Sequence, residues 1–248
     1  MQFSDKTIII TGGSSGIGAD MARAFADQGA LVWIAGRRPE KLRDVAAHAP
    51  DRIKTRICDV SVEADVVALF DAAGPPDIVI ANAGFADNNP LVRVQTPDWD
   101  RIIATNLTGA FWTLREAARR MTTGWGRIIA ISSIAGLRGL AYAAPYAASK
   151  HGLIGLVRSL ALEVADKGIT VNAICPGYVE TELTDAAIER ITARSGRSAD
   201  EASAAMTSLN PMGRMIRPDE ITSAALWLAS EGASSVNGET IAISGGQA

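Results

Sequence analysis

Three side chains near the middle of the chain could carry out proton transfer: Ser133, Tyr146 and Lys150. Residues four positions apart project from the same face of a helix, so Tyr146 and Lys150 would lie one turn apart. An ammonium beside a phenol favours the ionised form and lowers its pKa from about 10 toward neutrality. A tyrosine in this state can exchange a proton with a substrate oxygen. The alternative interpretation is an ordinary solvated pair on a helix surface.

Strands and helices are predicted to alternate around these residues. Short apolar runs rich in β-branched residues predict strands at 6–10, 30–35, 52–57, 77–81, 126–132, 169–174 and 239–243. Helical patterns lie between them, after Gly18, at about 97–121, from Pro145 onward, within 181–211 with a break at 195–196, and at 219–229. Residues 175–178 are expected to break the sixth strand. This alternation predicts an α/β fold, a doubly wound parallel sheet of about seven strands with helices on both faces, in one domain covering residues 1–248.

A glycine-rich stretch at 11–18 follows the first predicted strand and precedes a helix. Glycines allow the backbone to approach a pyrophosphate closely, and the helix N-terminus supplies N–H donors. The stretch therefore predicts a dinucleotide site, although its G-x-x-x-G-x-G spacing differs from G-x-G-x-x-G. A tight strand-to-helix turn without a ligand is the alternative.

The end of the second strand is where the adenosine ribose of a dinucleotide should lie. Gly36 stands where a carboxylate could bind the ribose 2′-hydroxyl, and Arg37 and Arg38 follow. Guanidinium groups bind phosphate through two parallel hydrogen bonds, so the pair favours NADP over NAD. Alternatively, the two arginines begin a solvated helix. Asp59, after the third strand, could bond the adenine amino group or cap the next helix, a role that Ser61 could also fill.

Composition excludes several classes of function. The 248 residues carry a net charge of −3, which does not predict a nucleic-acid partner. We find no apolar run long enough for a membrane span and no signal peptide, so a cytoplasmic protein is expected. The two cysteines, Cys58 and Cys175, lie in apolar runs and are expected to be buried free thiols. No cluster has metal-ligand spacing, so no metal cofactor is predicted.

Taken in order, these motifs resemble the short-chain dehydrogenase/reductase family along essentially the whole chain. The resemblance rests on the stretch at 11–18, Asn82-Ala83-Gly84, Asn106, Ile131-Ser132-Ser133, Tyr146-x-x-x-Lys150 and Pro176-Gly177. It implies a Rossmann-type fold, NAD(P)(H)-dependent interconversion of a carbonyl and a secondary alcohol, and a homotetramer. It also implies that Tyr146 is the general acid or base and that Ser133 binds the substrate oxygen. Lys150 would hold the nicotinamide ribose, and Asn106 would lie beside a proton-carrying water chain.

Motifs and resemblance together predict the residues that bind the cofactor. This set is Gly12, Ser14, Ser15, Gly16, Ile17, Gly18, Arg37, Arg38, Asp59, Val60, Asn82, Ala83, Gly84, Tyr146, Lys150, Pro176, Gly177, Val179 and Thr181. Within the family, residues 143–152 and 175–181 look most like ketoreductases that act on 3-oxoacyl thioesters and polyketide chains. The alternatives are an NAD-dependent dehydrogenase of a secondary alcohol or 3-hydroxyacyl compound, and a non-catalytic dinucleotide-binding regulator.

The substrate pocket is predicted from loops and from the helical segment at about 181–211, which we expect to be a mobile cover. Its candidate wall residues are mostly apolar: Leu137, Leu140, Tyr142, Tyr178, Leu183, Met206 and Leu209. Arg190, Arg194 and Arg197 could meet the phosphates of a thioester carrier, or form a solvated helix face.

Overall fold

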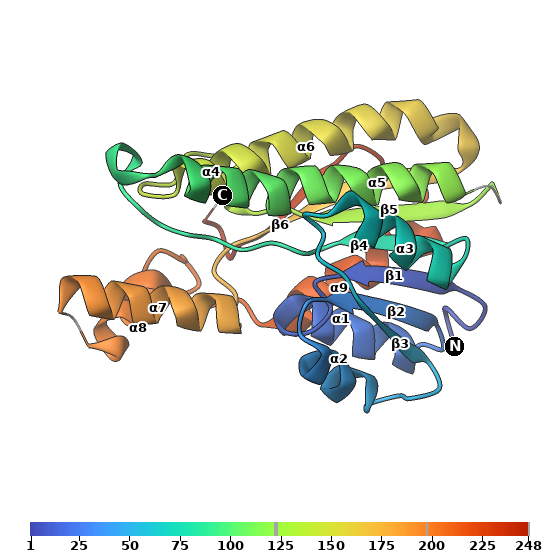
Figure 1. Ribbon diagram of the computed structural model, residues 1–248, viewed down its shortest axis with the longest axis horizontal. Helices are drawn as coiled ribbons and strands as arrows, with labels where there is room; N and C mark the ends of the chain where they lie inside the picture. Colours follow the sequence, from blue (N-terminus) through green and yellow to red (C-terminus); the bar gives the residue numbers. More distant parts are fainter. Residues whose placement is uncertain (122–123, 197, 248) are drawn as a thin grey trace.

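The computed structural model describes residues 1–121, 124–196 and 198–247 (Figure 1). Its strands are β1 (Thr7–Thr11), β2 (Leu31–Gly36), β3 (Ile53–Ile57), β4 (Ile78–Ala81), β5 (Gly126–Ile131), β6 (Ile169–Pro176) and β7 (Thr240–Ile243). Its α-helices are α1 (Gly16–Asp27), α2 (Pro39–Ala46), α3 (Glu63–Ala73), α4 (Thr96–Ile103), α5 (Gly109–Arg120), α6 (Ala144–Val164), α7 (Glu182–Ser195), α8 (Ala199–Thr207) and α9 (Pro218–Leu228). Each predicted strand is present, with its ends shifted by a few residues at most.

The seven strands form one parallel sheet in the order β3-β2-β1-β4-β5-β6-β7. The chain builds outward from β1 in one direction and then from β4 in the other. Ligands bind outside the carboxyl ends of the strands at such a reversal point. The doubly wound parallel sheet predicted from the sequence is confirmed, and its topology points to the carboxyl ends of β1 and β4.

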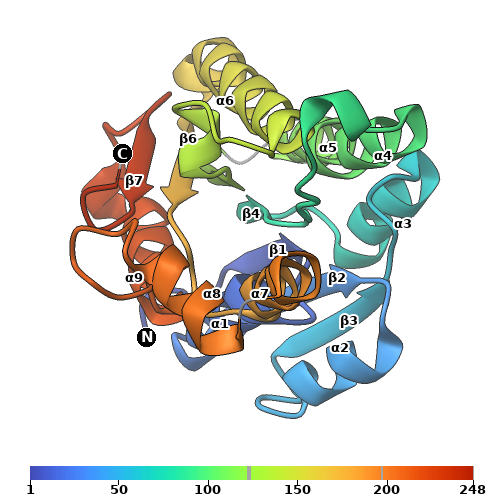
Figure 2. The same ribbon diagram turned by 90° about the vertical axis from the view of Figure 1, so that its left-hand side faces the viewer.

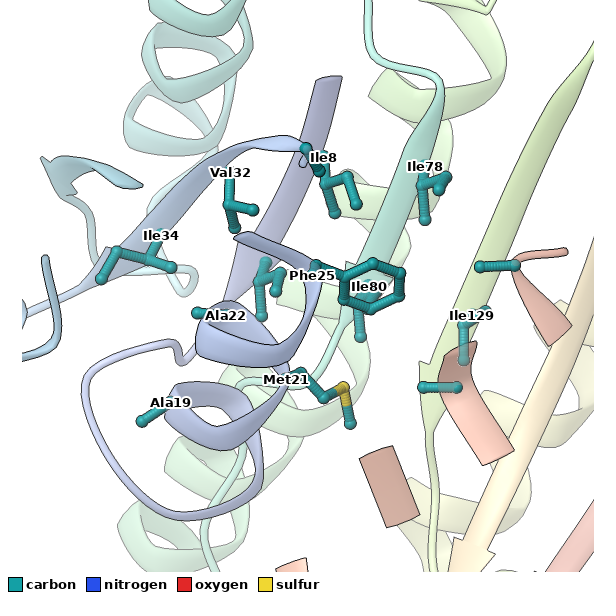
Figure 3. Close-up of a cluster of buried hydrophobic side chains, with 14 of the residues drawn as sticks. Ile8, Ala19, Met21, Ala22, Phe25, Val32, Ile34, Ile78, Ile80 and Ile129 are labelled. Carbon is teal, nitrogen blue, oxygen red and sulfur yellow. The ribbon is translucent and has the colours of Figure 1, made fainter. Parts of the chain in front are cut away.

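Helices cover both faces of the sheet, as Figure 2 shows. Successive residues of a strand point to opposite faces, so a strand buried on both sides is apolar throughout. In β1, Ile8 and Ile10 pack with side chains of α1 and α9, whereas Ile9 packs with side chains of α3, α5 and α6. Figure 3 shows the first of these clusters, with Phe25 of α1 beside Ile80 of β4. The uninterrupted isoleucine run of β1 follows from this two-sided burial.

Two elements differ from the sequence-based expectation. The helix expected at about 97–121 is divided by a π-helical segment, Ala104–Thr108, which contains Asn106. Such segments are rare and often occur at functional sites. The sixth strand extends two residues beyond its predicted end at 174, to Pro176, which pairs with Ile243, and it ends within the expected break at 175–178. Proline is tolerated at this last strand position because the next residue, Gly177, donates the hydrogen bond to the Ile243 carbonyl (3.0 Å).

The pair α7 and α8 projects from the sheet toward the left of Figure 1. The break predicted at 195–196 is confirmed: α7 ends before Gly196, whose φ is +71°, and a Ser198–Glu201 capping box begins α8. Cys58 and Cys175 are buried free thiols, as predicted. Among the described residues, no helix is long and apolar enough to cross a membrane, and no group of three or more His, Cys, Asp or Glu side chains is placed to hold a metal ion.

Candidate active site

A cavity of about 440 Å³ opens at the carboxyl ends of the central strands. Most of the predicted cofactor-binding residues line it: Gly12, Ser14, Ser15, Gly16, Ile17, Arg37, Arg38, Asp59, Val60, Asn82, Ala83, Gly84, Tyr146, Lys150, Pro176, Gly177, Val179 and Thr181. Ser133 lines the same cavity. Folding thus brings together residues from the ends of six strands, from Gly12 after β1 to Gly177 after β6.

The glycine turn is packed tightly against the end of β4. Gly12 has a φ of +67°, and a Cβ there would lie 2.8 Å from the Cα of Ala83. The Asn82 amide donates to the Thr11 and Gly12 carbonyls at 2.9 and 3.1 Å, tying the turn to β4. Gly18 lies behind the cavity wall, where a Cβ would approach the Gly12 carbonyl oxygen to 2.4 Å. Gly18 therefore permits α1 to pack on the turn rather than facing the cavity.

Ser133, Tyr146 and Lys150 meet at one side of the cavity. Ser133 follows β5 directly, and its Oγ accepts a hydrogen bond from the Ala135 N–H at 3.1 Å. Tyr146 lies in the first turn of α6, where Pro145 is accommodated as predicted, and its phenol hydrogen-bonds to the Ser133 hydroxyl. Lys150 lies one turn further along α6, with its Nζ 5.7 Å from the centre of the Tyr146 ring. The predicted spacing of the three side chains is present in the fold.

The electrostatics of this group differ from the expectation. Burial raises the pKa of Tyr146 above its ordinary value, and the hydrogen bond with Ser133 acts in the opposite direction. Burial also lowers the pKa of Lys150 from 10.5 to about 8. The Lys150 Nζ donates to the Ile131 carbonyl at 2.8 Å. The predicted lowering of the phenol pKa is therefore wrong for this structure, because loss of solvent outweighs the lowering effect of Ser133.

The buried ammonium predicts a pH-dependent cost to stability. Since the pKa of Lys150 is about 8 in the folded protein, the unfolded chain binds the extra proton between pH 8 and 10.5, and stability rises with pH in that window. Lys150→Met should raise the free energy of unfolding at pH 7 by about 1–2 kcal/mol, after the loss of the donor to the Ile131 carbonyl. Urea titrations should show this advantage shrinking between pH 8 and 10. An equal difference in the free energy of unfolding between Lys150→Met and the wild type at every pH would contradict this prediction. Lys167→Met, at an exposed site, is the control.

Asn106 is fully buried and fixes the loop after β4 through hydrogen bonds to its backbone. Its Oδ1 accepts from the Phe85 N–H at 3.0 Å, and its Nδ2 donates to the Phe85 carbonyl at 2.8 Å and to Ser149 Oγ at 3.3 Å. A Cβ on Gly84 would lie 3.2 Å from Asn106 Oδ1 and 3.5 Å from Lys150 Nζ. Asn106 therefore positions the loop and α6 beside Lys150, and it lies behind the cavity wall rather than in it.

Arg37 and Arg38 line the cavity after β2, away from Tyr146, and Lys41 lies outside the lining in the first turn of α2; we call these three residues the basic end. Arg37 Nη1 lies 3.8 Å from Asp59 Oδ2. Asp59 Oδ1 accepts hydrogen bonds from the Ser61 N–H (3.0 Å) and hydroxyl (2.6 Å). The next helix begins at Glu63, after Val62, so neither Asp59 nor Ser61 is its N-cap.

Comparison with known proteins identifies the family. A family model described as enoyl-(acyl carrier protein) reductase matches residues 12–248. The 3-oxoacyl-(acyl-carrier-protein) reductase FabG of Rickettsia bellii is 36% identical over 247 residues, which cover 99% of this chain and 98% of the relative. The chain belongs to the short-chain dehydrogenase/reductase family.

Solved structures of the family share the complete fold. Actinorhodin polyketide ketoreductase, crystallised as a variant with NADPH, is 34% identical with a TM-score of 0.92, over 100% of this chain and 99% of that one. Levodione reductase is 32% identical with a TM-score of 0.93, over 99% of this chain and 98% of that one. This short-chain dehydrogenase/reductase is accordingly an NAD(P)(H)-dependent oxidoreductase that interconverts a carbonyl and an alcohol.

The cavity of this short-chain dehydrogenase/reductase fits a nicotinamide dinucleotide. The N-terminus of α1 follows the compressed glycine turn, and Ser15 makes no side-chain cap there, so the first-turn N–H groups suit a pyrophosphate. The basic end suits the adenosine ribose, and Tyr146 and Lys150 line the cavity away from it. The basic end, the glycine turn and the pair Tyr146 and Lys150 are contributed independently. They follow one another in the order of the adenosine ribose, the pyrophosphate and the nicotinamide of a dinucleotide.

The predicted substrate wall is only partly correct. Leu140, Tyr178, Leu183 and Met206 line the cavity, whereas Leu137, Tyr142 and Leu209 lie on the exposed surface outside it. Residues that the sequence did not single out also line it, namely Phe85, Ala86, Asn88, Thr105, Ile134, Glu182, Thr184 and Ala187. Arg190 donates to the Ala86 carbonyl at 3.2 Å, so it is tied to the loop after β4. Arg194 belongs to α7, and Arg197 lies outside the described residues.

Proposed function

We propose that this chain is an NADPH-dependent reductase of a 3-oxoacyl thioester or a related ketone. The observation that carries the proposal is the convergence of Ser133, Tyr146 and Lys150, from two different elements, on the cavity that the glycine turn also lines. The names of the relatives, a 3-oxoacyl reductase and a polyketide ketoreductase, support the substrate class. The apolar side chains of Leu140, Leu183 and Met206 suit an acyl or polyketide chain.

In this proposal the residues act on the substrate oxygen. The bound nicotinamide supplies a hydride to the carbonyl carbon. Tyr146, whose raised pKa keeps the phenol protonated at neutral pH, gives its proton to the oxygen as negative charge develops there. Ser133 donates a hydrogen bond to the same oxygen. This bond strengthens as the negative charge develops and stabilises the transition state by about 3 kcal/mol.

Two further residues hold this arrangement. Lys150 binds the nicotinamide ribose, because its ammonium stands beside Gly84 and Tyr146 at the cavity wall. Asn106 is a positioning residue in this scheme, since its hydrogen bonds join the Phe85 backbone to Ser149 of α6. After turnover the Tyr146 phenolate takes up a proton from solvent, which restores the phenol for the next cycle.

The preference for NADP rests on the basic end of the cavity. Gly36 provides no carboxylate for a ribose 2′-hydroxyl, and Arg37 and Arg38 both line the cavity beside it. The NADPH in the actinorhodin ketoreductase structure supports the same assignment. The remaining predicted cofactor residues are proposed to contact the dinucleotide, except Gly18, which acts through packing.

We further propose that residues 1–248 are a single oxidoreductase domain in which α7 and α8 cover the substrate. Leu183 and Ala187 of α7 and Met206 of α8 contribute to the cavity wall, which supports that role. A homo-oligomer, as the family resemblance implies, is supported by exposed large apolar side chains, including Trp227 of α9 and Leu162 of α6.

The test is a comparison of the two reduced cofactors with acetoacetyl-coenzyme A, followed through the nicotinamide absorbance. We expect consumption of NADPH, with a kcat/KM at least about tenfold higher than with NADH, which corresponds to roughly 1.4 kcal/mol. If the protein turns over only NAD with a secondary alcohol, the reductase proposal is wrong and the NAD-dependent dehydrogenase is favoured. Tight binding of a dinucleotide without turnover of any ketone or alcohol would favour the regulator.

A further inference from the structure

Glu182, the first residue of α7, binds two cations of the basic end at once. Both terminal nitrogens of Arg38 donate to Glu182 Oε2 at 3.2 Å, and Lys41 Nζ donates to Oε1 at 3.0 Å. Arg38 also donates to Ser15 Oγ at 2.9 Å. All three charged side chains are about half exposed, so solvent and a ligand can reach the group. The proposed reaction does not use Glu182.

The carboxylate stands where the adenosine ribose of a dinucleotide would lie. Ser15, Arg38 and Glu182 line the same cavity. The chain leading into α7 crosses the glycine turn, since a Cβ on Gly16 would lie 3.2 Å from Thr181 Cγ2. Glu182 directly follows Thr181 in the chain, so its carboxylate lies near the glycine turn as well as near Arg38 and Lys41.

We propose that Glu182 is a specificity-determining residue that competes with a 2′-phosphate for Arg38 and Lys41. This inference rests on the proposed role of Arg38 in binding NADP(H). A phosphate monoester carries a charge of about −1.5 to −2 at neutral pH, so it repels a carboxylate that shares its cations. NADP(H) must displace Glu182 or bind against this repulsion, whereas NAD(H), which has a neutral 2′-hydroxyl, leaves the ion pairs intact.

The charges around the basic end make this competition effective. Arg37 also has an acidic partner, Asp59, at 3.8 Å. Each cation of the basic end thus faces a carboxylate in the free protein. Glu182 differs from Asp59 in belonging to the covering helix rather than to the sheet. Its displacement by a phosphate consequently releases the start of α7 from α2, which links the kind of cofactor to the attachment of the cover.

Binding measurements on Glu182→Gln test the competition. We expect the Kd of NADPH to fall by about three- to tenfold at low ionic strength, because two ion pairs no longer have to be broken, while the Kd of NADH changes by less than about twofold. Asp185→Asn is the matched control, since it removes the same charge from an exposed position in the first turn of α7. This control should change neither Kd by more than about twofold. Higher salt should reduce the effect of Glu182→Gln.

Ligand fragments separate this effect from catalysis. Adenosine 2′,5′-bisphosphate should bind Glu182→Gln more tightly than the wild type, and adenosine 5′-monophosphate should bind both equally by calorimetry. In an Arg38→Ala background, the gain from Glu182→Gln should largely disappear, as expected for residues that act through one contact.

The outcomes distinguish the two proposals. If Arg38→Ala weakens NADPH binding but Glu182→Gln leaves it unchanged, or changes NADPH and NADH equally, the competition is refuted and the NADP assignment stands. If Arg38→Ala has no effect on NADPH binding, the cofactor assignment itself fails, and with it the proposed role of Glu182.

Discussion

Tyr146→Phe is expected to lower kcat for carbonyl reduction by about 10²- to 10⁴-fold, the usual contribution of a general acid. The phenyl ring retains the packing of the buried side chain, while the only proton donor that this position offers is removed. The Kd for NADPH should stay within about twofold of the wild-type value, because the glycine turn and the basic end are unchanged. Steady-state kinetics and a separate fluorescence titration of NADPH measure the two quantities.

The chain has three tyrosines, so a complete control series is available. Tyr142 is 66% exposed and lies outside the cavity, and Tyr142→Phe should leave kcat unchanged. Tyr178 lines the cavity from the loop after β6, and its replacement by phenylalanine should alter KM more than kcat. Near-wild-type turnover by Tyr146→Phe with a good substrate would show that this phenol does not transfer the proton.

Gly18→Ala is expected to abolish cofactor binding although Gly18 does not face the cavity. The new Cβ would lie 2.4 Å from the Gly12 carbonyl oxygen and 2.5 Å from Asn82 Nδ2, distances that require the backbone of the turn or α1 to move. We expect a loss of about 1–3 kcal/mol in the free energy of unfolding, as for other overpacked sites. The Kd for NADPH should rise by at least about 100-fold, because the turn and the N-terminus of α1 no longer hold their relative position.

A second glycine provides the matched control for this substitution. Gly155 lies in the exposed part of α6, and a Cβ there would meet no described heavy atom within 4 Å. Gly155→Ala should stabilise the protein by about 0.5–1 kcal/mol through its higher helix propensity, without changing the Kd. Urea titration measures both stabilities, and binding is measured at a temperature at which each variant is folded. Wild-type affinity in Gly18→Ala would show that the packing of α1 on the turn does not shape the site.

Much of the fold could be predicted because its signals are local. The apolar runs of β1, β4 and β5 and the glycine turn after β1 are each contained in a few consecutive residues. A parallel sheet then places the ends of these strands at one edge, which brings Ser133 and the Tyr146 helix to the glycine turn. Strand ends were less accurate: β6 was expected to end at 174, before a break at 175–178, but it continues to Pro176.

The sequence by itself determined the order of strands and helices, the sites of the turns, and the side chains available for proton transfer. Only the tertiary structure decided how these side chains are charged and paired. The raised pKa of Tyr146 and the lowered pKa of Lys150 result from burial, which depends on atoms contributed by the whole fold. Arg38 contacts Glu182, which lies 144 positions away in the chain. Asn106, which accepts a hydrogen bond from the Phe85 N–H, lies in a π-helical segment. Neither contact leaves a local pattern, because each depends on which loops the sheet brings together in space.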